Sequence, residues 1–189
     1  MSADNVGNDE SVVAALLAVA DVLEAEGSPY AVIGALAAAQ HGLIRATQDV
    51  DLLVAVPAVR LPALLAKLEQ SGCQIDQARV IREWTSEHLT QFRYRDVPID
   101  WLEPVIPLFQ LVLDRATTRD VLGHPVRFAD ADGVVLMKLV AFRPGDRQDV
   151  DALALACRDV DWTFVRGQLE SVFGPDDERL AWLRANIPS

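Results

Sequence analysis

Residues 30–56 read YAVIGALAAAQHGLIRATQDVDLLVAV, and two apolar runs in this segment predict the centre of the fold. The first run ends at Gly34 and the second opens at Asp49. Both runs contain β-branched residues between turn signals, so each predicts a buried strand. Side chains alternate along a strand, so Asp49 and Asp51 should point the same way, roughly 6–7 Å apart. Because two such carboxylates repel each other, we expect a divalent metal ion between them.

Gly34 is expected to end the first strand and to precede a short helix over 35–40, a run of good helix formers. Such a turn leaves backbone N–H groups free at the positive end of the helix dipole, where a phosphate can bind. Because Gly34 has no Cβ, a phosphate could approach the backbone closely. An ordinary tight turn is the alternative interpretation.

The 189 residues suit one domain, or a core domain with a helical extension. We expect an N-terminal helix in 1–28, an α/β core in 29–128 and a helical region in 129–189. No apolar run reaches the ~18–20 residues of a membrane span, and the first residues lack the basic character of a leader. Cys73 and Cys157 predict two buried free thiols. These features favour a cytoplasmic protein with no membrane partner.

The net charge of −11 is unevenly distributed. Residues 1–28 carry six acids and no Lys or Arg, whereas 29–128 have a net charge of −1 and 129–189 a net charge of −4. An acidic protein binds polyanions poorly, because affinity for nucleic acids comes mainly from neutralising phosphates. The near-neutral middle segment leaves room for one basic patch, but scattered solvated arginines are the preferred interpretation.

The rest of the chain predicts further elements. We expect helices near 11–27, 57–72, 105–118, 130–142, 146–157, 161–173 and 176–186, strands near 74–82, 89–95 and 97–102, and a hairpin of 120–122 with 126–128. Pro98 cannot donate a ladder hydrogen bond, which indicates an edge strand or a strand start. Asp100 takes the opposite strand face from Ile99 and Trp101. Asp100 is therefore a third acid on a strand that could lie beside Asp49 and Asp51.

These residues resemble a known signature. Gly34-Ala35, thirteen residues, and then Asp49-Val50-Asp51 resemble the motif of the DNA polymerase β-like nucleotidyltransferase superfamily, whose third acid lies on a later strand. The segment from Gly42 to Asp51, with Arg45 and Thr47, resembles the G-x-x-R-x-T-x-D-x-D form of small bacterial members. Family members commonly have Ser or Gly where this chain has Ala35, which favours weaker phosphate binding.

Two later stretches extend the resemblance to about residues 28–157. Val135–Leu139, which contains Lys138, and Arg147–Leu153 are similar to the lysine-bearing helix and the R-x-D-x-x-x-L stretch of the AbiEii-type family. Characterised members of that family are toxins of type IV toxin–antitoxin systems, so the resemblance implies a possible cognate antitoxin. It also implies an α/β (α+β) fold with a small mixed twisted sheet flanked by helices and a helical C-terminal part.

The resemblance further implies a set of site residues. Asp49, Asp51 and Asp100 would bind magnesium, as two ions, and take part in catalysis together with Asp149. A nucleoside triphosphate would contact Gly34, Ala35, Arg45, Thr47, Lys138 and Arg147. Independently of the resemblance, Mg²⁺ prefers a few carboxylates with phosphate oxygens and water, and three aspartates supply such an incomplete shell.

Lys138 is one of only two lysines against fifteen arginines, and it lies within an apolar helical run. Such a lysine needs either a route to solvent or an anionic partner. A triphosphate would be that partner, and a solvent-facing lysine is the alternative. Asp149 could help to deprotonate the acceptor hydroxyl, or it could form a helix-start ion-pair cluster with Arg147 and Asp151.

The function predicted from the sequence is Mg²⁺-dependent transfer of a nucleoside monophosphate from a nucleoside triphosphate to a hydroxyl. The acceptor could be an RNA 3′ end, a protein side chain or a small molecule such as an aminoglycoside-like compound. Two alternatives are an inactive nucleotide-binding or interaction module, which Ala35 favours, and a metal-dependent phosphohydrolase.

Overall fold

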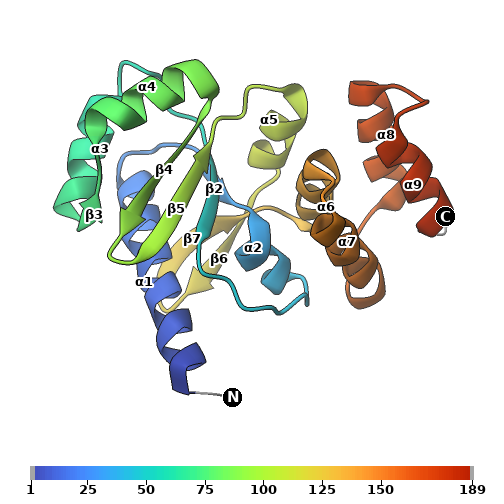
Figure 1. The fold of residues 1–189 in the computed structure, drawn as a ribbon, viewed down its shortest axis with the longest axis horizontal. Helices are drawn as coiled ribbons and strands as arrows, with labels where there is room; N and C mark the ends of the chain where they lie inside the picture. The colour runs from blue at the N-terminus through green and yellow to red at the C-terminus, as the bar shows by residue number, and fades with distance from the viewer. Residues whose placement is uncertain (1–2, 188–189) are drawn as a thin grey trace.

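The computed structural model describes residues 3–187 of the chain, and the side chains of residues 10–187. Within this part, a seven-stranded mixed sheet is flanked by helices (Figure 1), which confirms the predicted fold class. The strands are β1 Tyr30–Val32, β2 Val50–Val54, β3 Cys73–Gln74, β4 Leu89–Tyr94, β5 Val97–Leu102, β6 Thr117–Val121 and β7 His124–Phe128. The helices are α1 Ala3–Ala25, α2 Gly34–Gln40, α3 Leu61–Gln70, α4 Gln77–Glu87, α5 Pro107–Asp114, α6 Ala131–Ala141, α7 Pro144–Ala156, α8 Trp162–Phe173 and α9 Glu178–Asn186.

The strand order of the sheet is β3-β4-β5-β2-β1-β7-β6. At its centre β2 is antiparallel to β1 and parallel to β5. In the parallel pair Asp51 is the direct partner of Asp100. Side chains of directly paired residues on neighbouring strands lie on the same face, so this register brings the two carboxylates together.

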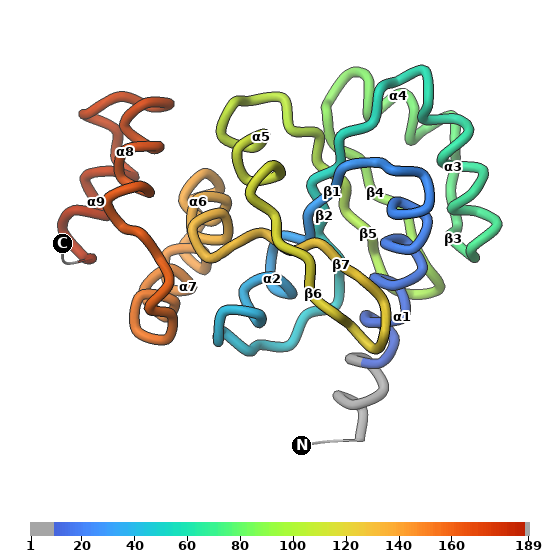
Figure 2. The backbone as a smooth tube through the Cα atoms, turned by 180° about the vertical axis from the view of Figure 1, so that it is seen from behind, coloured from blue at the N-terminus to red at the C-terminus, as the bar shows by residue number. Residues whose placement is uncertain are grey.

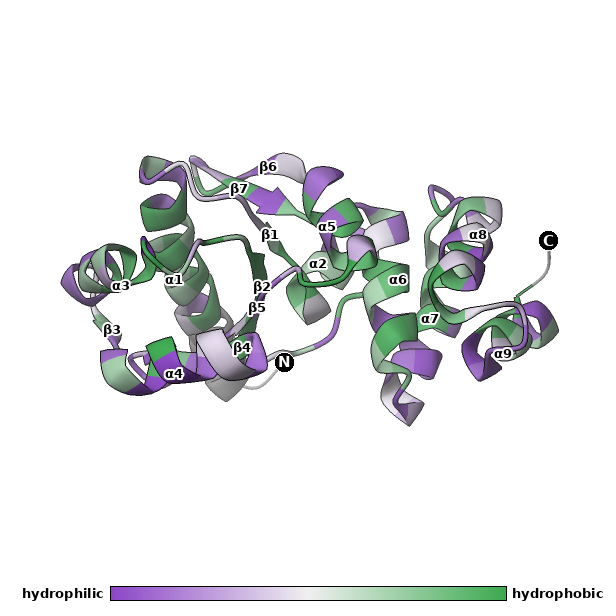
Figure 3. Cartoon of the chain, turned by 90° about the horizontal axis from the view of Figure 1, so that it is seen from above, coloured by the Kyte–Doolittle hydropathy of each residue, from purple (hydrophilic) through white to green (hydrophobic). Residues whose placement is uncertain are grey.

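The core lies on both faces of the central strands. Every residue of β1 is fully buried, as are Leu52, Leu53 and Val54 of β2. Helices α1, α3 and α4 cover one face, α2 and α5 cover the other, and α6 packs against α2 and α5 (Figures 1 and 2). Hydrophobic residues dominate the centre of the sheet and α1, and hydrophilic residues are frequent on the outer helices α4 and α9 (Figure 3). Burial of both faces explains why the two central runs are continuously apolar.

The described part of the chain after β7 consists of helices joined by short connections, as predicted. Helices α6 and α7 pack against each other, α8 packs on α6, and α9 packs on α8. Helices α8 and α9 lie at the opposite end of the molecule from α3 (Figure 1). No helix within residues 3–187 combines the length and the apolar character needed to cross a membrane.

The strand predicted over 74–82 is wrong, because most of it belongs to α4. The Asp76 side chain accepts a hydrogen bond from the backbone N–H of Arg79 and so caps the helix. Val80 and Trp84, one helical turn apart, are the buried residues of α4. The local run of Val80 and Ile81 looked strand-like, but the cap and the spacing of four residues favour a helix.

Other boundaries also differ from the prediction. Helix α1 begins at Ala3, before the expected start at Ser11, and α5 ends at Asp114, because Thr117 already pairs in β6. Of the two interpretations of Pro98, the strand start is correct and the edge strand is wrong, since β5 lies between β4 and β2. The ladder between β5 and β2 begins at Ile99, so Pro98 removes no hydrogen bond from it.

Candidate active site

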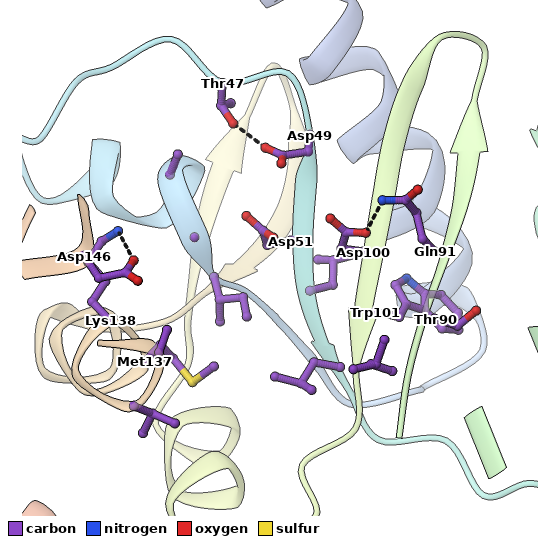
Figure 4. A pocket seen from close by; sticks show the side chains of 18 of the residues that line it. Thr47, Asp49, Asp51, Thr90, Gln91, Asp100, Trp101, Met137, Lys138 and Asp146 are labelled. Carbon is purple, nitrogen blue, oxygen red and sulfur yellow. Dashed lines mark hydrogen bonds and ion pairs between the residues drawn. The ribbon is translucent and has the colours of Figure 1, made fainter. Parts of the chain in front are cut away.

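Three aspartates converge where β2 and β5 lie side by side. Asp49 immediately precedes β2, Asp51 belongs to β2, and Asp100 belongs to β5. Each offers one carboxylate oxygen, and these three oxygens lie within 4.8 Å of one another. The three carboxylates point toward a common space (Figure 4). The predicted convergence of Asp100 with the other two acids is confirmed, and the all-oxygen donor set suits Mg²⁺.

The surroundings of Asp51 disfavour the ionised form of its carboxyl group. Burial, followed by the negative charges of Asp49 and Asp100, raises the pKa of Asp51 to about 6, while Lys138 and Arg143 act in the opposite direction. An ionised Asp51 at neutral pH is therefore held against a repulsive field. A cation among the three carboxylates would relieve that repulsion.

Neutral side chains orient two of the three carboxylates. The Thr47 hydroxyl donates to Asp49 Oδ1 at 2.6 Å, and the Gln91 amide Nε2 donates to Asp100 Oδ1 at 2.7 Å (Figure 4). Each bond uses one carboxylate oxygen and leaves the other available to a metal ion. The structure thus places Thr47, which the motif assigned to nucleotide binding, against a metal-binding candidate. Gln91 is a new positioning candidate, visible only through its pairing with Asp100 across β4 and β5.

Gln91→Met removes the amide donor at similar side-chain length. We expect divalent-cation affinity to fall about 10–100-fold, because hydrogen-bond partners of metal ligands typically have effects of that size. Isothermal titration with Mn²⁺ measures this. Gln110→Met is the matched control, because Gln110 donates a comparable bond of 2.8 Å to Asp114 on α5. Equal Mn²⁺ affinities in the two variants would contradict the orienting role.

The glycine at the end of β1 is required by Asp51. Gly34 has a φ angle of +64°, and a Cβ built on it would lie 1.9 Å from Asp51 Oδ2. Its neighbour Ile33 donates a backbone hydrogen bond to the Asp51 carbonyl oxygen. The space that the sequence assigned to a phosphate is therefore occupied, on this side of the glycine, by the carboxylate of Asp51.

Gly34→Ala is expected to destabilise the fold and to displace the Asp51 carboxylate. The left-handed backbone alone costs alanine about 1–2 kcal/mol, and the clash with Asp51 adds to this. Gly27→Ala is the control, because Gly27 has a φ angle of +58° and no atom within 4 Å of the built Cβ. Urea unfolding should show a larger loss for Gly34→Ala than for Gly27→Ala, and only Gly34→Ala should weaken Mn²⁺ binding. Equal losses of stability and affinity would refute the steric argument.

The aspartates face a cavity of about 950 Å³, large enough for a nucleotide or a drug-sized ligand. Its wall includes the apolar residues Ile33, Leu52, Leu102, Phe109, Met137 and Val140, and the polar residues Arg79, Glu83, Glu87, Thr90 and Gln91. Gly34, Ala35, Arg45, Thr47 and Lys138 also line the cavity. The structure thus brings together these five predicted nucleotide-binding residues and the three aspartates.

Lys138 of α6 is buried, with a relative exposure of 5%, so the solvent-facing alternative is wrong. Its Nζ donates to Asp149 Oδ2 at 2.5 Å and lies 4.0 Å from Asp146 Oδ1. An Arg45 nitrogen lies 3.3 Å from the same Asp149 oxygen. The anionic partner that Lys138 requires is therefore present within the chain.

Two predicted site residues do not reach the cavity. Among the described residues, neither Arg147 nor Asp149 belongs to the cavity wall. The Arg147 guanidinium lies over the Phe142 ring, 5.2 Å from its centroid. The ion pairs of Asp149 with Lys138 and Arg45 correspond to the predicted alternative of a structural cluster, although its partners differ from those expected.

No protein-family model and no curated protein matches the sequence of this chain. Solved structures do match. An antigenic nucleotidyltransferase-like protein from Paracoccidioides brasiliensis superposes with a TM-score of 0.54 and 15% identity, over 96% of this chain and 96% of that one. The antibiotic-resistance factor ANT(2'')-Ia in solution gives a TM-score of 0.53 and 16% identity, over 94% and 91%. The chain has a nucleotidyltransferase-like fold.

A further structure of ANT(2'')-Ia, in complex with adenylyl-2''-tobramycin, matches this nucleotidyltransferase-like fold with a TM-score of 0.51 and 14% identity, over 88% of this chain and 93% of that one. At such identities the likeness concerns the fold. The predicted nucleotidyltransferase-like fold is confirmed, and the AbiEii-type assignment stays a prediction.

Proposed function

We propose that this protein is a Mg²⁺-dependent nucleotidyltransferase that moves a nucleoside monophosphate from a nucleoside triphosphate to a hydroxyl acceptor. The observation that carries the proposal is the convergence of Asp49, Asp51 and Asp100 within 4.8 Å at a nucleotide-sized cavity. The nucleotidyltransferase-like fold supports it. Magnesium bound by these carboxylates would neutralise charge on the α-phosphate and on the leaving pyrophosphate.

The side chains of the cavity wall suit the parts of a nucleoside triphosphate. The three aspartate carboxylates line the cavity, and so do the cationic groups of Arg45, Lys138 and Arg143. These cations would hold the β- and γ-phosphates. The backbone at Gly34 and Ala35 would approach the same phosphates from the side that the Asp51 carboxylate does not occupy. The acceptor oxygen then bonds to the α-phosphorus, the bond to the bridging oxygen breaks, and pyrophosphate leaves with the electron pair. The hydroxyl proton is released.

We favour a small hydroxylated molecule as the acceptor. The structure of ANT(2'')-Ia with adenylyl-2''-tobramycin shows that a protein of this fold binds an adenylylated small molecule. The net charge of −11 also disfavours a polyanionic acceptor such as RNA. An RNA 3′ end and a protein hydroxyl are the competing acceptors in the test.

Label transfer tests this function. The protein is incubated with Mg²⁺ and each of the four nucleoside triphosphates labelled at the α-phosphate, together with aminoglycosides, tRNA or no added acceptor. Labelled product formed with equimolar pyrophosphate supports nucleotidyl transfer, and the labelled species identifies the acceptor. Phosphate release to water alone would indicate a phosphohydrolase. Nucleotide binding that survives Asp49→Ala and Asp51→Ala, with no product, would indicate an inactive binding module.

A toxin role, with a possible cognate antitoxin, is a second proposal, carried by the resemblance of short motifs within about residues 28–157 to the AbiEii-type family. If it is correct, expression should arrest growth, and Asp51→Ala should abolish the arrest. An equally toxic variant would end this proposal without affecting the label-transfer test.

A further inference from the structure

Two cationic side chains in the cavity wall share one carboxylate that lies outside that wall. Lys138 comes from α6 and Arg45 from the connection between α2 and β2, and both line the cavity. Both contact the same oxygen of Asp149 on α7, at 2.5 Å and 3.3 Å. Among the residues that the structure describes, Asp149 is not part of the cavity wall, and its side chain is only 13% exposed.

This arrangement does not suit Asp149 as a general base. A base must lie within hydrogen-bond reach of the hydroxyl that it deprotonates. Asp149 lies outside the cavity wall, and one of its oxygens is already bound to two cationic groups. We therefore discard the interpretation of Asp149 as a proton acceptor and consider its contacts with Lys138 and Arg45 instead.

The two cations keep donors for a ligand. An ammonium group has three N–H donors and a guanidinium has five, so contact with Asp149 leaves donors on both. The side chain of Lys138 is 6% exposed and that of Arg45 is 51% exposed. A buried lysine is thus linked through Asp149 to an exposed arginine on a separate connection, and ordering this arginine before a ligand arrives lowers the entropy cost of binding.

We propose that Asp149 is a positioning residue that aims Lys138 and Arg45 together at the β- and γ-phosphates of a bound nucleoside triphosphate. This inference rests on the proposed function. In this inference the R-x-D-x-x-x-L stretch orients cationic side chains and does not transfer a proton. The β- and γ-phosphates would then bind where α6, α7 and the α2–β2 connection meet. Asp149 acts through the two cations and does not touch the substrate.

The test compares Asp149→Asn with Asp151→Asn, which removes an exposed carboxylate from the same helix. Calorimetry in the presence of Mg²⁺ uses the nucleoside triphosphate that the wild-type protein binds best, its monophosphate, and inorganic triphosphate. We expect Asp149→Asn to weaken binding of the two triphosphates about tenfold or more and to leave monophosphate binding within about twofold. Asp151→Asn should leave all three affinities unchanged.

Other outcomes separate the competing interpretations. Unchanged triphosphate binding in Asp149→Asn would overturn the inference, and so would an equal loss for triphosphate and monophosphate, which indicates general damage to the fold. A wild-type protein that binds these ligands but transfers no label would contradict the proposed function and not the role of Asp149. Hydrogen exchange gives a readout without ligand: exchange in residues 43–47 should be faster in Asp149→Asn than in Asp151→Asn, and equal rates would overturn the inference.

Discussion

Asp51→Asn is expected to stabilise the metal-free protein at pH 7.5 by roughly 1–3 kcal/mol. Burial and the charges of Asp49 and Asp100 raise the pKa of Asp51 from its ordinary 3.8 to about 6. A shift of about two pKa units corresponds to about 3 kcal/mol at most. Because the raised pKa belongs to the folded state, the ionised carboxylate destabilises that state above pH 6. Asparagine keeps the shape of the side chain and removes the charge.

The stabilisation by Asp51→Asn should depend on pH. Between about pH 4 and pH 6 Asp51 binds more protons in the folded protein than in the unfolded chain, so its contribution to the free energy of unfolding decreases as the pH rises. Asp51→Asn lacks this decrease, and its advantage should therefore vanish near pH 4. Urea unfolding at pH 4 and pH 7.5 measures this, with Asp151→Asn as a control that changes stability by less than about 0.5 kcal/mol.

Addition of Mg²⁺ should act against the advantage of Asp51→Asn. A ligand that binds only the folded state raises the free energy of unfolding, so Mg²⁺ should stabilise the wild-type protein more than Asp51→Asn, which binds the ion more weakly. If Asp51→Asn is less stable than the wild-type protein at pH 7.5 without metal, the charge argument is wrong.

Asp100→Asn is expected to lower nucleotidyl transfer by about a thousandfold or more. Metal ions contribute several kcal/mol of transition-state stabilisation, and each 1.36 kcal/mol changes the rate tenfold. The substitution keeps the size of the side chain and a possible hydrogen bond with Gln91. Single-turnover label transfer at saturating nucleotide isolates the chemical step, because differences in nucleotide affinity no longer contribute.

The control for Asp100→Asn is Asp96→Asn, in the exposed turn between β4 and β5. This variant removes one carboxylate from the same hairpin, and its rate should stay within about twofold of the wild-type rate. If Asp100→Asn keeps more than a tenth of the wild-type rate, Asp100 is not part of the catalytic site.

The part of the site that is local in sequence could be predicted. Gly34, Asp49 and Asp51 lie within one strand–helix–strand segment, where alternation and turn chemistry determine direction. Asp100 could be predicted because alternation in residues 97–102 places it opposite to the apolar face. The seven-stranded order could not be predicted, because pairing partners of strands depend on contacts between distant residues.

The contacts of individual side chains could not be predicted from the sequence. The orienting role of Gln91 depends on the β4–β5 register, and the requirement for Gly34 depends on the rotamer of Asp51. The position of Arg147 in the motif is typical of a nucleotide contact, but its guanidinium lies over the Phe142 ring. For α4, the Asp76 cap and the four-residue spacing of Val80 and Trp84 favour a helix despite the strand preference of two β-branched residues.

Divalent-cation binding by the three aspartates is the most direct test. Electron paramagnetic resonance of Mn²⁺ counts the free ion in the presence of wild-type protein, Asp49→Asn, Asp51→Asn or Asp100→Asn, each with and without a nucleoside triphosphate. We predict that the wild-type protein binds Mn²⁺, that the triphosphate strengthens this binding, and that each substitution weakens it at least about tenfold. Equal Mn²⁺ binding by wild-type protein and Asp100→Asn would show that the three carboxylates do not form one metal site.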